Sequence, residues 1–221
     1  MKIYKIFIIY ILLSCFSPLY ISSTPAAGDE TADIIEMLRR LGENVSAFKS
    51  LKTNFVQEKD LAIFQNRIIM KGRIYLQKPN RMAWHVDEPV KYSVVITDKS
   101  IRQWDEDTNR VQEIALSGNP VFQNVLNQLT VWFSGDYISL LKDYDVRILK
   151  KAPLVFEFTP KGNNIAGKII KSITISLRED EKYLRQIKIL ELSGDSTTIT
   201  FKDTIFNAPI NDPDFEVKRR V

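Results

Sequence analysis

Few residues of this chain have types and positions that suit acid–base, nucleophilic or metal chemistry. The chain has 221 residues and one histidine, His85, which lies on the predicted strand face opposite Met82 and Trp84. The alternation of apolar and polar residues predicts that His85 is exposed and lacks an obvious partner. This argues against a His-based catalytic triad and against a multi-histidine metal site, so we expect no bound metal and no cofactor.

Two acidic clusters are the other candidates for catalytic groups. Residues 105–107 and 179–181 lie in predicted turns, where we expect the carboxylates to be solvated at hairpin tips. The eight glycines are scattered and form no phosphate-binding loop. We therefore expect a protein that is not an enzyme. Pairing of carboxylates in space is invisible in a sequence, so an enzyme that uses carboxylates alone stays open.

The N-terminus has the pattern of a secretory leader. Lys2 and Lys5 precede an uncharged apolar run over residues 6–21, and small residues follow at 22–27. A charged start, a short apolar run and small residues predict a signal peptide, cleaved near residues 23–27. We therefore expect residues 28–221 to form a single domain in the periplasm.

The only cysteine leaves a second possibility open. Cys15 follows Leu12, Leu13 and Ser14 within the leader, a sequence that resembles a bacterial lipobox. In that case the leader would be cleaved before Cys15, and the protein would be anchored in the envelope through lipid on Cys15. The apolar run continues past Cys15, which favours the later cleavage.

The charge of the chain gives no support to a nucleic-acid partner. The net charge is +4, and without Lys2 and Lys5 the remaining 29 basic and 27 acidic residues give +2. Basic residues are spread among acidic ones, apart from the run 218–220 at the C-terminus. We expect a monomer that does not bind nucleic acid.

The elements that would position any site are mainly strands. Apolar residues at spacings of three and four predict an amphipathic helix over residues 31–51. From residue 52 the period changes to two, and alternating runs with turn residues between them follow. These runs are 52–57, 68–76, 82–86, 92–96, 111–115, 154–158, 169–177, 183–192 and 197–206. Ten to eleven strands joined by short loops predict an antiparallel sheet that forms an open or incomplete barrel.

A helical insert interrupts the strands. Asn119 can cap a helix and Pro120 suits its first position, and apolar residues then follow on one stripe over 121–129. A second short helix is expected near Tyr137 to Leu141. The insert over 119–133 is either a core helix packed on the sheet or a movable lid.

The stretch 72–89, GRIYLQKPNRMAWHVDEP, predicts two strands joined by a turn at Pro79 and Asn80. By its pattern alone it is a hairpin that contributes Trp84 to an ordinary core. Together with Phe55 and Gln57, Pro89 and the run 95–98, however, it resembles the LolA family of periplasmic lipoprotein carriers. The resemblance extends over nearly the whole chain after the leader.

The resemblance implies an incomplete antiparallel barrel with an N-terminal helix and a helical lid, the lid falling at residues 119–129. It also implies a chaperone that takes lipoproteins from an inner-membrane ABC transporter to an outer-membrane acceptor. The lipoprotein acyl chains would lie in an apolar cavity. The candidate lipid-binding residues are Phe55, Leu76, Trp84, Ile96, Phe122, Leu126, Phe156, Ile173 and Ile189.

The resemblance further implies a latch that holds the lid. The family has an arginine just before the hairpin proline, and this chain has Lys78 there, so the latch would be shared between Lys78 and Arg81. Further departures at Lys99 and at residues 218–220 indicate a divergent member. A LolB-like acceptor anchored through Cys15 and an envelope lipid-sensing domain are the alternative functions.

Overall fold

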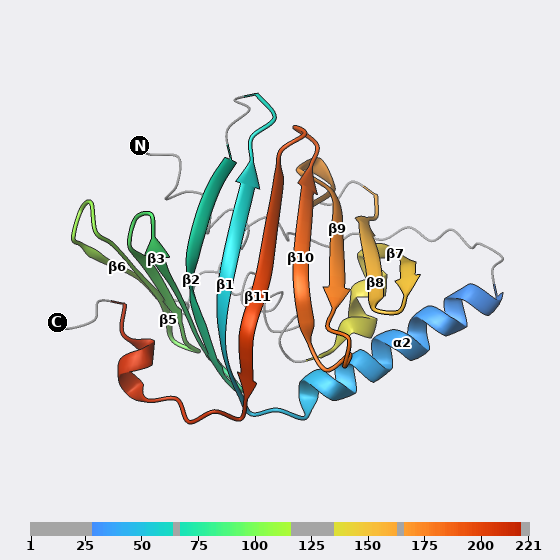
Figure 1. Cartoon of the computed structure of the whole chain (residues 1–221), viewed down its shortest axis with the longest axis horizontal. Helices are drawn as coiled ribbons and strands as arrows, with labels where there is room; N and C mark the ends of the chain where they lie inside the picture. The colour runs from blue at the N-terminus through green and yellow to red at the C-terminus, as the bar shows by residue number, and fades with distance from the viewer. Residues whose placement is uncertain (1–27, 64–66, 116–134, 163–165, 218–221) are drawn as a thin grey trace. The chain divides into compact units, whose positions relative to one another are not determined.

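The structure is a computed structural model that describes residues 28–63, 67–115, 135–162 and 166–217. Eleven strands form one sheet in the order β6-β5-β4-β3-β2-β1-β11-β10-β9-β8-β7. The pairs from β1–β2 to β5–β6 and from β7–β8 to β9–β10 are antiparallel. The predicted mainly β fold, an open antiparallel sheet with an N-terminal helix, is confirmed (Figure 1). The expected lid at 119–133 lies outside the described residues.

Most strands lie where the alternation predicts them. The bounds are β1 Ser50–Asp60, β2 Arg67–Gln77, β3 Arg81–Glu88, β4 Tyr92–Ile96, β5 Ser100–Asp105, β6 Val111–Ala115, β7 Tyr144–Lys151, β8 Leu154–Pro160, β9 Ile170–Leu177, β10 Leu184–Glu191 and β11 Ser196–Phe206. Strands β5 and β7 are absent from the sequence prediction. β7 has mostly exposed side chains, and β5 has four polar residues among its six, so their apolar signal is weak.

The chain forms two compact units. Unit 1 comprises residues 1–46 and 124–196, and unit 2 comprises residues 47–123 and 197–221. Unit 1 contains helix α2 (Gly28–Ser46), the 3-10 helices η1 (Tyr137–Lys142) and η2 (Ala166–Lys168), and strands β7 to β10. Unit 2 contains β1 to β6, nearly all of β11 and the 3-10 helix η3 (Asp212–Phe215). The prediction of a single domain over 28–221 stays a prediction.

The N-terminal helix ends earlier than its apolar pattern predicts. Helix α2 stops at Ser46, and β1 begins at Ser50 instead of continuing the helix to residue 51. Phe48, which continues the helical stripe in sequence, packs in unit 2 against Phe206, with ring centroids 5.2 Å apart. The short helix near Tyr137 is confirmed as η1.

Helix α2 packs closely within unit 1 because two glycines meet there. A Cβ on Gly42 would lie 2.2 Å from the carbonyl oxygen of Gly135, and Gly135 itself has a φ of +93°. Only glycine permits both this approach and this backbone conformation. Leu38 and Val45 on the same helix are fully buried.

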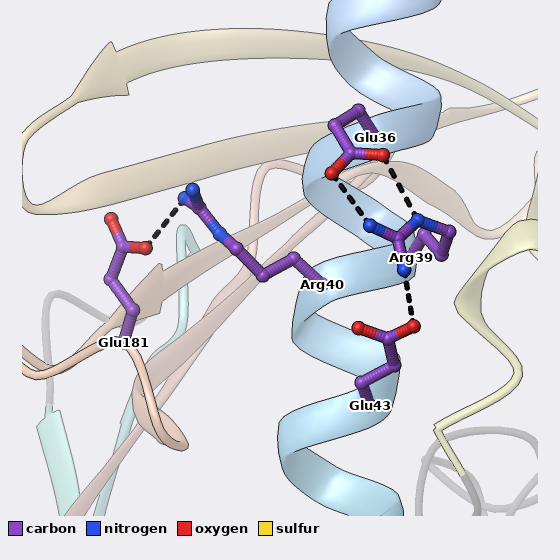
Figure 2. Close-up of polar contacts among 5 residues, drawn as sticks. All are labelled: Glu36, Arg39, Arg40, Glu43 and Glu181. Carbon is purple, nitrogen blue, oxygen red and sulfur yellow. Dashed lines mark hydrogen bonds and ion pairs between the residues drawn. The ribbon is translucent and has the colours of Figure 1, made fainter.

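Polar side chains link α2 to the turn between β9 and β10 within unit 1, and others pair along the helix itself (Figure 2). Arg40 Nη2 lies 2.6 Å from Glu181 Oε2, and Asn44 donates a hydrogen bond of 3.1 Å to the Glu181 carbonyl, in the turn between β9 and β10. Arg39 bonds Glu36 and Glu43 one turn away on either side. Exposed ion pairs of this kind contribute little to stability.

Unit 2 buries both faces of its central strands. Met82, Trp84 and Val86 occupy one face of β3, and Ala83 and His85 occupy the other. The second face is covered by the C-terminal segment 207–217. The cluster there consists of Tyr75, Ala83, Val95, Phe215 and Val217.

Candidate functional site

Four of the nine predicted lipid-binding residues lie on one face of unit 2. In the register of β1 to β4, Leu76 is opposite Met82, which is opposite Ile96, and in the next row Ile74 is opposite Trp84. Residues opposite each other project from the same face of a sheet, and Phe55 belongs to this face on β1. We call it the apolar face of unit 2, formed by Leu51, Phe55, Met70, Ile74, Leu76, Met82, Trp84, Val86, Val94 and Ile96.

Phe55 and Trp84 form the aromatic centre of this face. Their ring centroids are 4.7 Å apart with the planes tilted by 50°. Phe55 is 1% exposed and Trp84 is half-buried. Two large aromatic side chains in contact present a wide apolar surface, which can act as core or as a wall for an apolar ligand.

Three further candidates lie together in unit 1. Phe156 is opposite Ile175, and Ile173 is opposite both Phe158 and Ile189, so all of them share one face of β8 to β10. Phe156 and Ile173 are buried, and Ile189 is half-buried. The last two candidates, Phe122 and Leu126, lie outside the described residues.

The predicted latch residues lie at the hairpin turn of unit 2. The Lys78 ammonium is 4.2 Å from the centroid of the Phe48 ring, and its backbone N–H donates to the Lys49 carbonyl at 2.9 Å. Burial lowers the pKa of the Lys78 amine below its ordinary value. The proposed lid partner of Lys78 lies outside the described residues, so the latch stays a prediction.

Arg81 faces the C-terminal segment. Its guanidinium carbon is 4.1 Å from the centroid of the Phe215 ring, and Nη2 donates to Asp212 at 2.9 Å. A second bond of 3.2 Å runs to Gln77 Oε1. Arg81 therefore combines a cation–π contact with an ion pair to hold η3 against the hairpin.

The prediction for His85 is wrong. The residue is 4% exposed, its Nδ1 lies 2.9 Å from Ser93 Oγ, and its Nε2 lies 2.9 Å from the carbonyl oxygen of Asp214. Because a carbonyl only accepts, Nε2 carries a proton. The C-terminal segment covers this strand face, which local alternation alone does not reveal. His85 thus joins β3 and β4 to η3.

The acidic clusters also have structural contacts. Asp105 is buried at the end of β5 and accepts hydrogen bonds from the Thr108 N–H at 2.9 Å and hydroxyl at 3.0 Å. The prediction of a solvated tip is wrong for this residue, which instead stabilises the β5–β6 turn. Glu181 pairs with Arg40 in unit 1. Over the described ranges, no three His, Cys, Asp or Glu side chains are grouped to hold a metal ion.

A feature that sequence reasoning missed is a set of buried polar groups in unit 2. Gln57, two residues from Phe55 on β1, is 0% exposed, and among the described residues neither its Oε1 nor its Nε2 has a hydrogen-bond partner. The indole Nε1 of Trp84 and the hydroxyl of Thr197 on β11 are likewise buried without a partner within the described part of the chain. Leaving such a group unpaired costs about 1–3 kcal/mol. The period of two that places Phe55 on this face also places Gln57 there.

No helix in the described ranges is both long and apolar enough to cross a membrane. The model of the family described as "Outer membrane lipoprotein carrier protein LolA" matches residues 46–218. An outer-membrane lipoprotein carrier protein of Coxiella burnetii is 24% identical over 157 residues, which are 70% of this chain and 70% of that protein. One from Pseudomonas putida is 23% identical over 198 residues, 87% of this chain and 89% of that protein.

Two solved structures show the same fold. A conserved uncharacterised protein of Thermus thermophilus has a TM-score of 0.51 at 10% identity, covering 83% of this chain and 92% of its own. The Pseudomonas aeruginosa MucA/MucB complex has a TM-score of 0.50 at 16% identity, covering 82% of this chain and 60% of that chain. At these identities the likeness concerns the fold alone.

Proposed function

The chain belongs to the LolA family of outer-membrane lipoprotein carrier proteins, and from this premise we propose that it binds lipoprotein acyl chains and carries them through the periplasm. It acts by binding and release, without catalysis. The observation that carries the proposal is the apolar face of unit 2, where the Phe55 and Trp84 rings are in contact.

The physical need for such a face follows from the cost of exposing acyl chains to water. Each methylene group in water costs about 0.8 kcal/mol, so several chains cannot cross an aqueous compartment unshielded. Sheet faces that present Leu76, Ile96 and the aromatic pair in unit 2, and Phe156, Ile173 and Ile189 in unit 1, supply apolar surface for this purpose.

The proposed route begins at an inner-membrane lipoprotein-releasing ABC transporter and ends at an outer-membrane acceptor. A carrier on this route is a monomer in the periplasm, released from its leader near residues 23–27. Phe122 and Leu126 would add apolar surface from the lid, and Lys78 with Arg81 would hold that lid until lipid enters.

A second candidate function rests on Cys15. If the leader is cleaved before this residue, the protein is a LolB-like acceptor anchored in the envelope, or a lipid-sensing domain tethered there. The intact mass of the protein isolated from the envelope distinguishes the soluble carrier from these anchored forms. An unmodified N-terminus near residue 24 or 28 supports the soluble carrier, and an acylated Cys15 supports the anchored forms.

Binding is tested by purifying the protein from the envelope and analysing what it carries. We expect lipoprotein to co-purify and to crosslink to residues of the apolar face. Trp84→Ala should lose bound lipid, because it removes the larger ring of the aromatic pair. Trp104→Ala is a matched control, because Trp104 packs against the Tyr75 cluster on the other face. A folded protein that never carries lipoprotein would overturn the carrier function.

A further inference from the structure

Gln57 lies among the residues of the apolar face of unit 2, and the described residues offer its side chain no hydrogen-bond partner. Gln57 shares this face with Phe55, lies opposite Met70 in the β1–β2 register, and is fully buried. Both of its side-chain polar atoms lack a partner within the described part of the chain. A plain apolar core would favour leucine or methionine here, since a buried amide without hydrogen bonds is costly.

Two other polar residues on the same face, Thr53 and Gln103, are paired. The Thr53 hydroxyl lies 3.0 Å from the Lys202 carbonyl and 2.8 Å from Thr204 Oγ1. Gln103 accepts from the Tyr92 hydroxyl at 3.2 Å and donates to Gln112 at 2.6 Å. The fold thus pairs these two side chains, whereas the unpaired groups of Gln57 and the Trp84 indole require another explanation.

The unpaired groups are mostly hydrogen-bond donors. The Gln57 amide offers two N–H bonds and one acceptor, Trp84 Nε1 offers one N–H, and the Thr197 hydroxyl can donate as well. Ester carbonyls, which join acyl chains to glycerol, only accept. An amide N–H, such as that of a lipid-bearing cysteine, would pair with Gln57 Oε1.

The positions suit an extended ligand with more than one polar group. Gln57 is opposite Met70, and Trp84 is opposite Ile74 on the same strand β2. Four residues of strand separate these positions, about 13 Å along β2. Phe55 lies between them on β1 and contacts the Trp84 ring. The apolar surface between these two polar points can contact an acyl chain.

We propose that Gln57, with Trp84 Nε1 as a second donor, binds the ester and amide linkage of a diacylated lipid while the apolar face of unit 2 holds the acyl chains. The proposal rests on the carrier function above and adds a specificity to it. The protein distinguishes lipids by their carbonyl groups in addition to binding their acyl chains.

The test compares two probes that differ only in carbonyl groups. One is a synthetic lipopeptide with a diacylglyceryl cysteine, and the other is the dialkyl ether lipopeptide with chains of equal length. We expect the protein to bind the ester probe about five- to tenfold more tightly than the ether probe, as one or two hydrogen bonds predict. Dissociation constants are measured by displacement of a fluorescent lipid.

Two variants assign this preference to the proposed groups. Gln57→Leu should lower the ester-to-ether preference about fivefold, and Trp84→Phe, which keeps the ring and removes the N–H, should lower it less. Urea unfolding of each variant shows that the fold is kept, and Gln57→Leu should be no less stable than the natural chain. Gln103→Leu is the matched control, because this glutamine is already paired, and it should keep the full preference.

The outcomes separate the two proposals. If the natural chain binds both probes equally, or if Gln57→Leu keeps the preference, the linkage site is wrong while the carrier function stands. In that case the buried amide binds water only. If neither probe binds, the carrier function and the linkage site are both overturned.

Discussion

Gly72 lies directly opposite Phe55 in the β1–β2 register, and the Phe55 ring occupies the space that a side chain on Gly72 would need. A Cβ at Gly72 would be 2.9 Å from Phe55 Cε1 and 1.9 Å from the backbone oxygen of His85. The glycine that begins the hairpin stretch thus allows Phe55 to reach Trp84.

Gly72→Ala should therefore destabilise unit 2. The side chain of Phe55 can turn away from the new methyl group. The His85 carbonyl belongs to β3, however, and can move only if the strand shifts, so we expect the free energy of unfolding to fall by about 1–3 kcal/mol. Urea unfolding monitored by tryptophan fluorescence measures the change. Gly162→Asn is the control, because Gly162 has a φ of +58° with open space around it and asparagine tolerates this conformation. Equal stability of Gly72→Ala and the natural chain would contradict the close approach.

His85→Leu should release the C-terminal segment from β3 and β4. The change removes the bonds to Ser93, which is buried, and to the carbonyl of Asp214, which is half-buried, and we expect it to cost about 1–3 kcal/mol. Hydrogen exchange of residues 211–217 should become faster. Asp212→Asn is the comparison, since it breaks only the Arg81 ion pair, whose carboxylate side chain is 88% exposed. A larger effect from Asp212→Asn would show that the ion pair holds the segment.

Leu38→Ala and Arg40→Ala should separate packing from charge on helix α2. Leu38 is fully buried, so its truncation should cost about 2–5 kcal/mol. Arg40 pairs with Glu181 at the surface, so its loss should cost less than about 1 kcal/mol. Thermal unfolding of both variants measures the difference. Comparable losses would mean that the ion pair is stronger than its exposure suggests.

Lys78 should make stability depend on pH in the alkaline range. Burial lowers the folded-state pKa of its amine below the ordinary value of 10.5, so between the two values the unfolded chain binds more protons. The free energy of unfolding then rises as pH increases through this window, and the contribution is complete only above the unfolded pKa. Lys78→Met should flatten the curve, measured by urea unfolding at pH values from about 8.5 to 10.5. Lys78→Arg should flatten it as well, because arginine does not titrate there.

Lys78→Leu tests the proposed latch. The leucine keeps an apolar contact with Phe48 but cannot donate to a lid carbonyl, so the variant should retain lipid and transfer it to an acceptor at an altered rate. Transfer of labelled lipoprotein from the purified carrier to acceptor measures this. Lys78→Arg supplies the planar guanidinium group of the family's arginine and should transfer lipoprotein at least as fast as the natural chain. A natural rate for Lys78→Leu would show that no latch operates at this position.

The strands and the hairpin were predictable from sequence because their periodicity is local. Alternation places Met82, Trp84 and Val86 on one face without knowledge of the rest of the chain. β5 was missed, since only Ile101 and Trp104 give it an apolar signal. Local spacing also misplaced the end of the N-terminal helix. The apolar spacing continues to Phe48, but the helix ends at Ser46 and the Phe48 ring packs against Phe206 in unit 2.

The burial of the second face of β3, which carries Ala83 and His85, was not predictable from the sequence. His85 follows Trp84 in an alternating strand, and alternation assigns it to solvent. Ser93 and the Asp214 carbonyl, eight and 129 residues away, make it a buried connection instead. Tyr75, Ala83 and Val95 on that face are apolar, and this was the one sequence signal that something covers it.

By itself the sequence determined the class of the fold, the family and the apolar residues of one sheet face, because spacing along a strand decides which side chains share a face. Only the tertiary structure decided which polar groups on that face are paired. Thr53 and Gln103 find partners on neighbouring strands, and Gln57 does not. Hydrogen bonding depends on atoms brought together from distant parts of the chain, and a glutamine has the same sequence signature whether its amide is satisfied or left for a ligand.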